Sequence, residues 1–330
     1  MLTIHENLET ALESCTMVGI THGGIFHADE VLATVILERA FGDLGIVRVA
    51  SVPENVPSQV IVYDIGYGAF DHHQPQGAGN RKNGVPYASA GLIWRAYGKA
   101  ALKDTTEDKD NASKIWSMVD CRLVQGVDAV DCGVAPKNYQ YGVISLSQIV
   151  SGFNPVWNSN LSNNQAFKKA AGTMSQVLSN TIEYAAGIVK AEKAISQAID
   201  TAEQGILILP DFMPWREGVL RSANPKAEGI NFVIYPSVRG GYNWQVVPEN
   251  MSTRTARKEV PTAWWGLAGK ELQEVCGVPD ATFCHRAGFI GGAQSLLGAL
   301  AMVSADAAAI ALNQHARLAT VSATDLSTKS

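Results

Sequence analysis

The stretch that decides the fold begins with Thr21-His-Gly-Gly-Ile-Phe-His-Ala-Asp-Glu30, and it continues through Val60-Ile-Val-Tyr-Asp-Ile-Gly66 and Phe70-Asp-His-His-Gln74. Four of the seven histidines of the chain lie here, together with several carboxylates. Imidazole and carboxylate side chains together suit divalent ions such as Mn, Mg, Fe or Zn. The stretch contains no cysteine, so its pattern does not indicate a thiolate zinc site.

The flanking residues predict where these side chains lie. An apolar run, Met17–Ile20, precedes the first motif, and a strong helix former, Val31–Phe41, follows it, so the motif joins a strand to a helix. Residues 46–52 form a second predicted strand, and the wholly apolar residues 60–63 form a third, as in a parallel sheet buried on both faces. Ligands of open α/β sheets bind at the carboxyl ends of the strands. Convergence on one crevice is therefore predicted for His22, His27, Asp29 and Asp64.

Simpler interpretations exist for some of these residues. Asp29 and Glu30 are also suitable as helix N-terminal acids, which the helix dipole stabilises. We prefer that interpretation for Glu30 and a metal role for Asp29. His72 follows a strand-terminal aspartate closely and is predicted to bind metal, whereas His73 points elsewhere on an extended backbone and suits a substrate contact.

The Asp71-His72-His73 triplet, together with Asp64 and the acidic first motif, resembles the DHH phosphoesterase superfamily. The complete pattern, including Gly84-Val-Pro-Tyr-Ala-Ser-Ala-Gly-Leu-Ile-Trp94, is most similar to the melanocyte-proliferating-gene protein family. That family consists of metal-dependent hydrolases, described in eukaryotes as 3′–5′ RNA exonucleases. The resemblance extends over essentially the whole chain and implies an α/β fold, with a DHH-type N-terminal domain and a smaller C-terminal α/β domain of the DHH-associated type.

The resemblance also implies a two-metal site. Mn²⁺ is the expected ion, with Mg²⁺, Fe²⁺ and Zn²⁺ as alternatives, and His27 departs from the superfamily pattern because many relatives have aspartate there. A further aspartate should complete the site: Asp128 is slightly preferred over Asp131, and both follow a helix predicted from about 110 to 127. Asp120 is interpreted as an ordinary helix acid. The implied metal ligands are His22, His27, Asp29, Asp64, His72 and Asp128 or Asp131, and the implied catalytic residues are Asp64, His72 and His73.

The composition of the chain argues against several other classes of protein. The chain has 330 residues and a formal net charge of −5, with a pI near 5.8. A protein that coats nucleic acid needs many Lys and Arg contacts, so this composition argues against that class. The five scattered cysteines indicate reduced thiols, and together with the absence of a signal-peptide pattern they lead us to expect a cytoplasmic protein. No apolar run is long enough for a membrane span, and the alanine-rich stretch near 299–312 is predicted to be a buried helix.

The chain is predicted to divide into a sheet-and-helix catalytic domain at 1–160, a helical connector at 161–204 and a substrate-binding domain at 205–330. The connector is long for one helix, so the sequence leaves open a break near Gly172 or Gly187. It also offers a surface for a homodimer, which the sequence leaves open. In the last domain, two strand-like runs around Gly240-Gly241 predict a hairpin.

Basic and glycine-rich segments are the candidates for substrate contacts. Arg81 lies in a loop that is equally suited to solvent exposure or to meeting a phosphate. Residues 283–294 are predicted to open a helix, where glycine backbone N–H groups and the dipole favour an anion, although glycines also serve close packing. The resemblance favours substrate binding there. The predicted substrate contacts are Arg81, Arg254, Arg257, His285, Arg286, Gly291 and Gly292.

Three functions remain in competition. The first is a 3′–5′ exonuclease that acts on RNA or short oligonucleotides through a metal-activated water that attacks phosphorus. The second is a hydrolase of a small phosphate compound, such as a cyclic dinucleotide or pyrophosphate, which the acidic net charge suits. The third is a non-enzymatic metal- or nucleotide-binding protein. The first is preferred, with RNA or an oligonucleotide as the expected partner and no membrane association.

Overall fold

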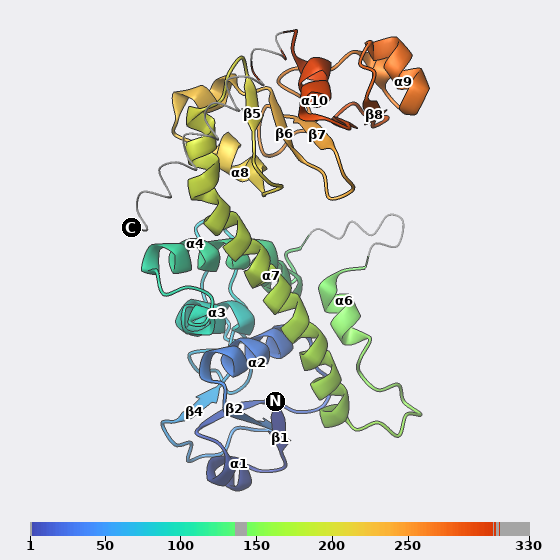
Figure 1. The fold of residues 1–330 in the computed structure, drawn as a ribbon. Coiled ribbons are helices and arrows are strands. Elements are labelled where there is room, and N and C mark those ends of the chain that lie inside the picture. Colours follow the sequence, from blue (N-terminus) through green and yellow to red (C-terminus); the bar gives the residue numbers. More distant parts are fainter. Residues whose placement is uncertain (1, 136–143, 306, 308–309, 311–330) are drawn as a thin grey trace, which may run out of the picture. The chain divides into compact units, whose positions relative to one another are not determined.

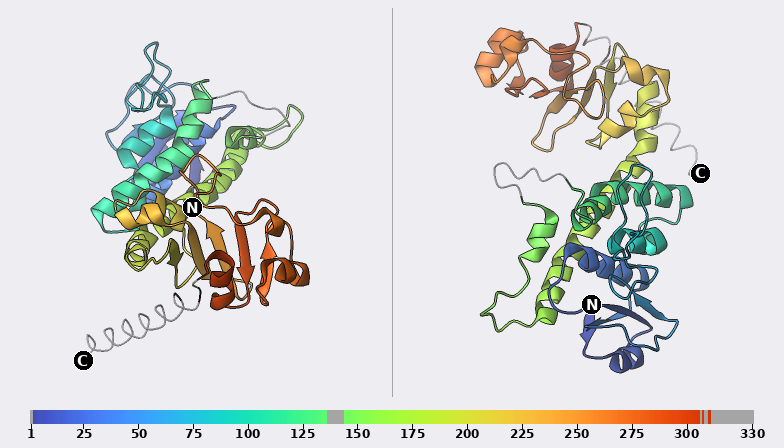
Figure 2. Two further views of the ribbon diagram at one scale, coloured as in Figure 1. Left: turned by 90° about the horizontal axis from the view of Figure 1, so that it is seen from above. Right: turned by 180° about the vertical axis from the view of Figure 1, so that it is seen from behind.

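The computed structural model describes residues 2–135, 144–305, 307 and 310. It separates into two compact units, Met1–Ala186 and Gly187–Ser330, and the division falls inside one long helix, α7 (Asn163–Asp200). Each unit has its own sheet (Figures 1 and 2). No helix in the described part of the chain is both long and apolar enough to cross a membrane.

The first unit contains a four-stranded sheet in the order β1-β3-β2-β4. All three neighbouring pairs are parallel, which confirms the predicted parallel sheet. The short edge strand β1 was not predicted from the sequence. The strands are β1 (Thr3–His5), β2 (Met17–His22), β3 (Leu44–Val49) and β4 (Val60–Val62).

Helices cover both faces of this sheet, as Figure 1 shows for α1 (Leu8–Ser14) and α2 (Ala28–Phe41). Alternate residues of β2 point to opposite faces, so Val18 and Ile20 join Ala11 of α1 in one core cluster. Helix α2 lies on the other face and is buried along most of its length. Its Thr34 hydroxyl lies 2.6 Å from the Tyr63 hydroxyl, which fixes α2 against the end of β4.

A helical layer follows α2. It comprises α3 (Ser89–Tyr97), η1 (Ala100–Leu102), α4 (Lys109–Val119), the π-helical turn η2 (Asp120–Val124) and α5 (Gln125–Asp131). The predicted helix therefore does not end before Asp128, because the π turn carries it on to Asp131. Single π turns inside α-helices are frequent at functional sites. Asp128 and Asp131 consequently stand one turn apart on the same helix.

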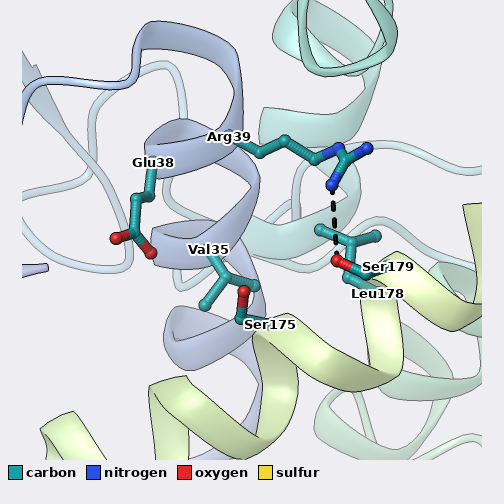
Figure 3. Close-up of a pocket in the computed structure, with 6 residues that line it drawn as sticks. All are labelled: Val35, Glu38, Arg39, Ser175, Leu178 and Ser179. Carbon is teal, nitrogen blue, oxygen red and sulfur yellow. Dashed lines mark hydrogen bonds between the residues drawn. The ribbon is translucent and has the colours of Figure 1, made fainter. Parts of the chain in front are cut away.

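Helix α6 (Leu146–Ser151) precedes α7, which runs unbroken for 38 residues. The break near Gly172 or Gly187 that the sequence left open does not occur, since the helix continues through both glycines and the surrounding residues favour helix. The first part of α7 packs on α2, where Arg39 Nη1 donates to Ser179 Oγ over 3.3 Å (Figure 3). A cavity of about 200 Å³ lies beside this contact, and none of the described residues that line it is a histidine.

The second unit contains a mixed five-stranded sheet in the order β5-β6-β7-β9-β8. Only β5 and β6 pair in parallel, and the predicted β6–β7 hairpin is confirmed. The end of α7 and α8 share one core cluster with Leu207 and Val233, whereas α9 and α10 share another with Ile206 and Ile234. The elements are β5 (Ile206–Ile208), α8 (Trp215–Leu220), η3 (Pro225–Gly229), β6 (Phe232–Pro236), β7 (Tyr242–Val246), η4 (Thr262–Trp264), α9 (Gly269–Cys276), β8 (Ala281–Cys284), β9 (Ile290–Ala293) and α10 (Leu296–Val303).

The prediction that residues 283–294 open a helix is wrong. Gly291 and Gly292 lie within strand β9, and the next helix begins only at Leu296, capped by Ser295. A side chain at Gly291 would collide with the ring of Trp244 on the neighbouring strand. These glycines therefore serve close packing, the alternative that the sequence had left open. The predicted buried helix near 299–312 is confirmed as far as Val303, where α10 ends, and positions 306, 308, 309, 311 and 312 lie outside the described residues.

Candidate metal centre

Two strand ends place the first two side chains of the site. His22 is the last residue of β2, and Asp64 follows the neighbouring parallel strand β4 by two residues. Asp64 has a left-handed backbone (φ 56°), a conformation in which aspartate and asparagine are enriched. Its N–H donates to the Phe70 carbonyl over 3.0 Å, which brings the Asp71-His72-His73 loop to the same edge of the sheet.

His22, His27 and Glu30 form the first group that could hold a metal ion. His22 Nε2 lies 3.0 Å from Glu30 Oε1 and 3.4 Å from Asp64 Oδ2. Glu30 also accepts from the His27 N–H at the N-terminus of α2, over 2.9 Å. Glu30 is therefore the helix N-terminal acid that we preferred and, in addition, a member of this group.

Asp64, Asp71, His72 and His73 form the second group. Asp71 Oδ1 lies 2.7 Å from His73 Nδ1, and Asp71 also accepts the backbone N–H groups of residues 67 and 73. His72 Nδ1 lies 3.5 Å from Asp64 Oδ1. The two imidazole rings stack at 4.3 Å instead of pointing apart, and the His73 side chain remains 55% exposed.

The third group consists of Asp29, His72 and Asp131. Asp131 Oδ2 lies 2.9 Å from His72 Nε2, while Asp29 Oδ2 lies 3.7 Å from His72 Nδ1. His72 therefore belongs to two of the groups and links them. Of the two aspartates that the sequence left as alternatives, Asp131 is the one that contacts this histidine, whereas Asp128 does not belong to any group among the described residues.

Helix α3 points its N-terminus at these acids. The Ser89 and Ala90 N–H groups donate to Asp29 over 2.9 and 2.6 Å, and the Gly91 N–H donates to Asp128 over 3.0 Å. The partial positive charge of a helix N-terminus stabilises carboxylates placed there. A side chain at Gly91 would collide with the Asp128 carboxylate, so glycine is required for this approach.

Ser89 is a site residue that the sequence reasoning missed. Its hydroxyl donates to Asp64 Oδ1 over 3.1 Å and lies 3.2 Å from His72 Nδ1, so it fixes the orientation of both. The only signal was its position at the start of a helix within the motif Ala88-Ser-Ala-Gly91. That position alone does not distinguish it from an ordinary helix-start serine.

Arg81 is placed differently from the predicted phosphate contact. Its guanidinium is buried and binds Asp120 through Nε and Nη2, over 2.9 and 2.7 Å. Its Nη1 lies 2.7 Å from Asp128 Oδ2, and its charge also lies over the Tyr87 ring. Arg81 thus joins its loop to η2 and α5. Asp120 is accordingly a buried partner of this arginine and not an ordinary helix acid.

The site collects more negative charge than its surroundings neutralise. Burial, followed by the charges of Asp64, Asp131 and Asp128, raises the pKa of Asp29 well above its ordinary value. Burial likewise raises the pKa of Glu30. Hydrogen bonds to Asp64 and then Glu30 raise the pKa of His22 to about 10. Burial lowers the pKa of His72, but the contact with Asp131 and the charges of Asp64 and Asp71 together outweigh it, and the net shift is upward.

This donor set fits divalent cations. Asp29, Glu30 and Asp64 are almost fully buried, and within the described residues the ion pairs of these three acids are with histidines only. Buried charges are normally paired or coordinate metals. The raised pKa values of His22 and Asp29 reflect an excess of negative charge that a bound cation would balance. Imidazole and carboxylate ligands suit Mn, Fe and Zn.

The groups open into a cleft of about 850 Å³, within the range of small-molecule sites. None of the described residues that line the cleft is lysine or arginine. Its lining residues include His22, His27, Asp64, Tyr67, Asp71, His72, His73, Asp131, Cys132, Ser147 and Ser151.

The residues of the second unit that were predicted to contact substrate differ in their exposure and in their hydrogen-bond partners. Arg257 Nη1 donates to the backbone carbonyls of Ala227 and Ile230 over 2.7 and 2.9 Å, which gives it a structural partner. Arg254 and Arg286 are exposed. His285 Nδ1 accepts from the Ala287 N–H over 3.1 Å, and its ring packs beside that of Phe289.

Comparison with known proteins places the chain in a family. The family profile MYG1_exonuc, described as Uncharacterised protein family (UPF0160), matches residues 18–306. The chain belongs to the MYG1 exonuclease family. The matched span contains every residue of the three groups that could hold a metal ion.

Several family members align along most of the chain. A MYG1 protein of Saccharomyces cerevisiae is 33% identical over 309 residues, which cover 83% of this chain and 91% of the yeast protein. A MYG1 protein of Schizosaccharomyces pombe is 33% identical over 86% of this chain and 94% of its own length. The MYG1 exonuclease of Homo sapiens is 30% identical over 86% of this chain and 84% of its own length. No solved structure matched the chain.

Proposed function

We propose that the protein is a metal-dependent phosphoesterase of the DHH type that removes 3′-terminal nucleotides from RNA or short oligonucleotides. The observation that carries this proposal is the convergence of three histidine–carboxylate groups around Asp64 and His72, at the carboxyl ends of parallel strands. The name exonuclease, which the human relative carries, supports the reaction class. The catalytic domain is proposed to span 1–160, the connector 161–204 and the substrate-binding domain 205–330.

Each group has a proposed task in this reaction. The metal ligands would be His22, His27, Asp29, Asp64, His72 and Asp131, with Glu30 and Asp71 added by their position beside them. Divalent ions bound there would offset the charge of the phosphate and lower the pKa of an attacking water. Asp128 is proposed to act through its pairing with Arg81 and Gly91.

His73 is proposed as the residue that meets the substrate phosphate. Asp71 holds its Nδ1–H at 2.7 Å, which fixes the ring and leaves Nε2 to accept a proton and then to donate a hydrogen bond. The side chain is half exposed and lines the cleft. A hydrogen-bond donor at that position would stabilise negative charge on a phosphate oxygen as the bond breaks.

A second candidate, hydrolysis of a small phosphate compound, is favoured by one specific observation. The cleft has the volume of a small-molecule site, and none of the described residues that line it is lysine or arginine. A long RNA would need such cations along its backbone. Among exonuclease substrates, the same observation favours oligonucleotides of a few residues.

The test is hydrolysis of a 3′-labelled short RNA with Mn²⁺ by the wild type and by Asp64→Asn. Asparagine keeps the shape of Asp64 and tolerates its left-handed backbone, so the fold should survive. Asp104→Asn is the matched control, because Asp104 is an exposed aspartate outside the groups. Release of labelled mononucleotide by the wild type and the control, but not by Asp64→Asn, is expected.

Cleavage of pyrophosphate or cyclic dinucleotides alone would support the second candidate instead. Equal turnover of RNA by the wild type and Asp64→Asn would refute the proposed site. Calorimetric titration of Mn²⁺ gives an independent measure, since Asp64→Asn should lose metal affinity and Asp104→Asn should retain it.

A further inference from the structure

Tyr67 occupies a backbone conformation that a tyrosine rarely adopts. It lies in Asp64-Ile-Gly-Tyr-Gly68 and has a φ of 58°, in the left-handed region. A bulky residue in this region is a genuine outlier. Glycine adopts it without a steric penalty, and the chain places glycines at Gly66 and Gly68 on either side. The turn alone therefore does not explain an aromatic residue at this position.

The backbone of Tyr67 is anchored to the metal centre. Its N–H donates to Asp71 Oδ2 over 2.7 Å, and the other oxygen of the same carboxylate holds His73. Strained residues persist when the surrounding structure determines them, and they gather at active sites and ligand clamps. The conformation of Tyr67 is thus fixed relative to the ring that we propose meets the phosphate.

The side chain of Tyr67 is not used by the fold. Tyr67 is 70% exposed although it is a large aromatic residue. Within the described part of the chain, no hydrogen bond involves its phenol and no other ring stacks on it. It nevertheless lines the cleft together with His73 and Asp131. Among the described residues that line the cleft, Tyr67 therefore offers a free aromatic face beside the proposed metal ligands.

We propose that the Tyr67 ring is the stacking platform for the nucleobase next to the reacting phosphate. Exposed aromatic side chains bind bases of single strands in this way, and each such stack contributes about 5- to 150-fold in affinity, equivalent to about 1–3 kcal/mol. The inference rests on the proposed function and adds the part of the substrate that the metal-binding groups do not recognise. Every base has a π face, so the platform requires a base without selecting one.

Binding of adenosine monophosphate and ribose 5-phosphate tests the platform, because the two ligands differ only in the base. The wild type, loaded with Mn²⁺, should bind the nucleotide about 5- to 150-fold more tightly in calorimetric titration. Tyr67→Gly should bind both ligands equally, with the affinity for ribose 5-phosphate unchanged. Tyr67→Phe should keep the preference, since the phenol has no partner. Glycine relieves the backbone strain, so the melting temperature of Tyr67→Gly should equal or exceed that of the wild type.

Tyr184→Ala is the matched control, because Tyr184 is another exposed tyrosine of the same unit and does not line the cleft. It should retain the full preference for the nucleotide. The inference is overturned if wild type binds the two ligands equally or binds neither, or if Tyr67→Gly keeps the preference. Failure of the wild type to cleave any oligonucleotide would overturn the proposed function instead, and this binding comparison would still report on the platform.

Discussion

Replacing Arg81 by methionine should destabilise the protein by about 3–5 kcal/mol at pH 8, because removal of one partner from a buried ion pair leaves an uncompensated charge. Arg81 binds Asp120 through two hydrogen bonds and lies 2.7 Å from Asp128. All three residues are buried. Methionine retains most of the length of the side chain, so the loss reports on charge more than on packing.

The cost of this substitution should depend on pH. Burial raises the pKa of Asp128 to about 7, although Arg81 lowers it. An unfolded aspartate has a pKa of about 3.9. Between about pH 4 and 7 the native state therefore binds more protons than the unfolded state. The contribution of Asp128 to stability consequently falls as the pH rises through that window. Without Arg81 the native pKa of Asp128 rises further. At pH 5 Asp128 is then neutral in both the wild type and Arg81→Met, and the loss of stability caused by the substitution should fall to roughly half its value at pH 8.

Urea unfolding followed by circular dichroism, with chelator present at pH 5 and pH 8, measures both values. Arg95→Met is the matched control, because Arg95 is an exposed arginine whose guanidinium lies over the same Tyr87 ring. Its substitution should change stability by no more than about 0.5 kcal/mol. Wild-type stability of Arg81→Met at pH 8, or an equal cost at the two pH values, would refute the reasoning.

Three further changes test the fold and the metal centre. Mn²⁺ at about 100 times its dissociation constant should stabilise chelator-treated protein by about 2.7 kcal/mol in calorimetry. Asp64→Asn should lose most of this stabilisation. A wild-type melting temperature that Mn²⁺ leaves unchanged would contradict the metal site. Gly291→Ala should cost about 1–3 kcal/mol by overpacking against the β7 tryptophan, whereas Gly229→Ala, which faces open space, should leave the urea midpoint unchanged. Gly172→Ala and Gly187→Ala should each stabilise an unbroken α7 by about 1 kcal/mol, and destabilisation would argue for a break.

The parallel sheet of the first unit could be predicted because its signals are local. Apolar runs marked β2, β3 and β4, and the residues after Glu30 marked α2. Parallel pairing then placed His22 and Asp64 at one edge without any knowledge of the packing. The assignment of metal ligands stays a prediction, although the structure brings most of the proposed side chains into contact.

Partners that are distant in sequence could not be predicted in the same way. Arg81 and Asp120 are 39 positions apart, and an arginine in a glycine-rich loop is equally suited to solvent or phosphate. Ser89 reaches Asp64 only because α3 turns its N-terminus toward the sheet edge. Glycine in β9 was ambiguous for another reason. A glycine is suitable both for close packing and for a helix N-terminus, because it has no side chain. Only the position of Trp244 shows that close packing is the role of Gly291.

The N-terminus of α3 explains how the fold tolerates so many buried acids. Its first N–H groups bind Asp29 and Asp128, acids contributed by two separate helices, and its Ser89 hydroxyl binds Asp64. Arg81 neutralises only the side of the cluster that faces Asp120 and Asp128. The compensation therefore decreases from α5 toward Asp64 and Glu30, where histidines are the only ion-pair partners among the described residues. This gradient leaves the strongest unbalanced charge beside the cleft, where a divalent ion would bind.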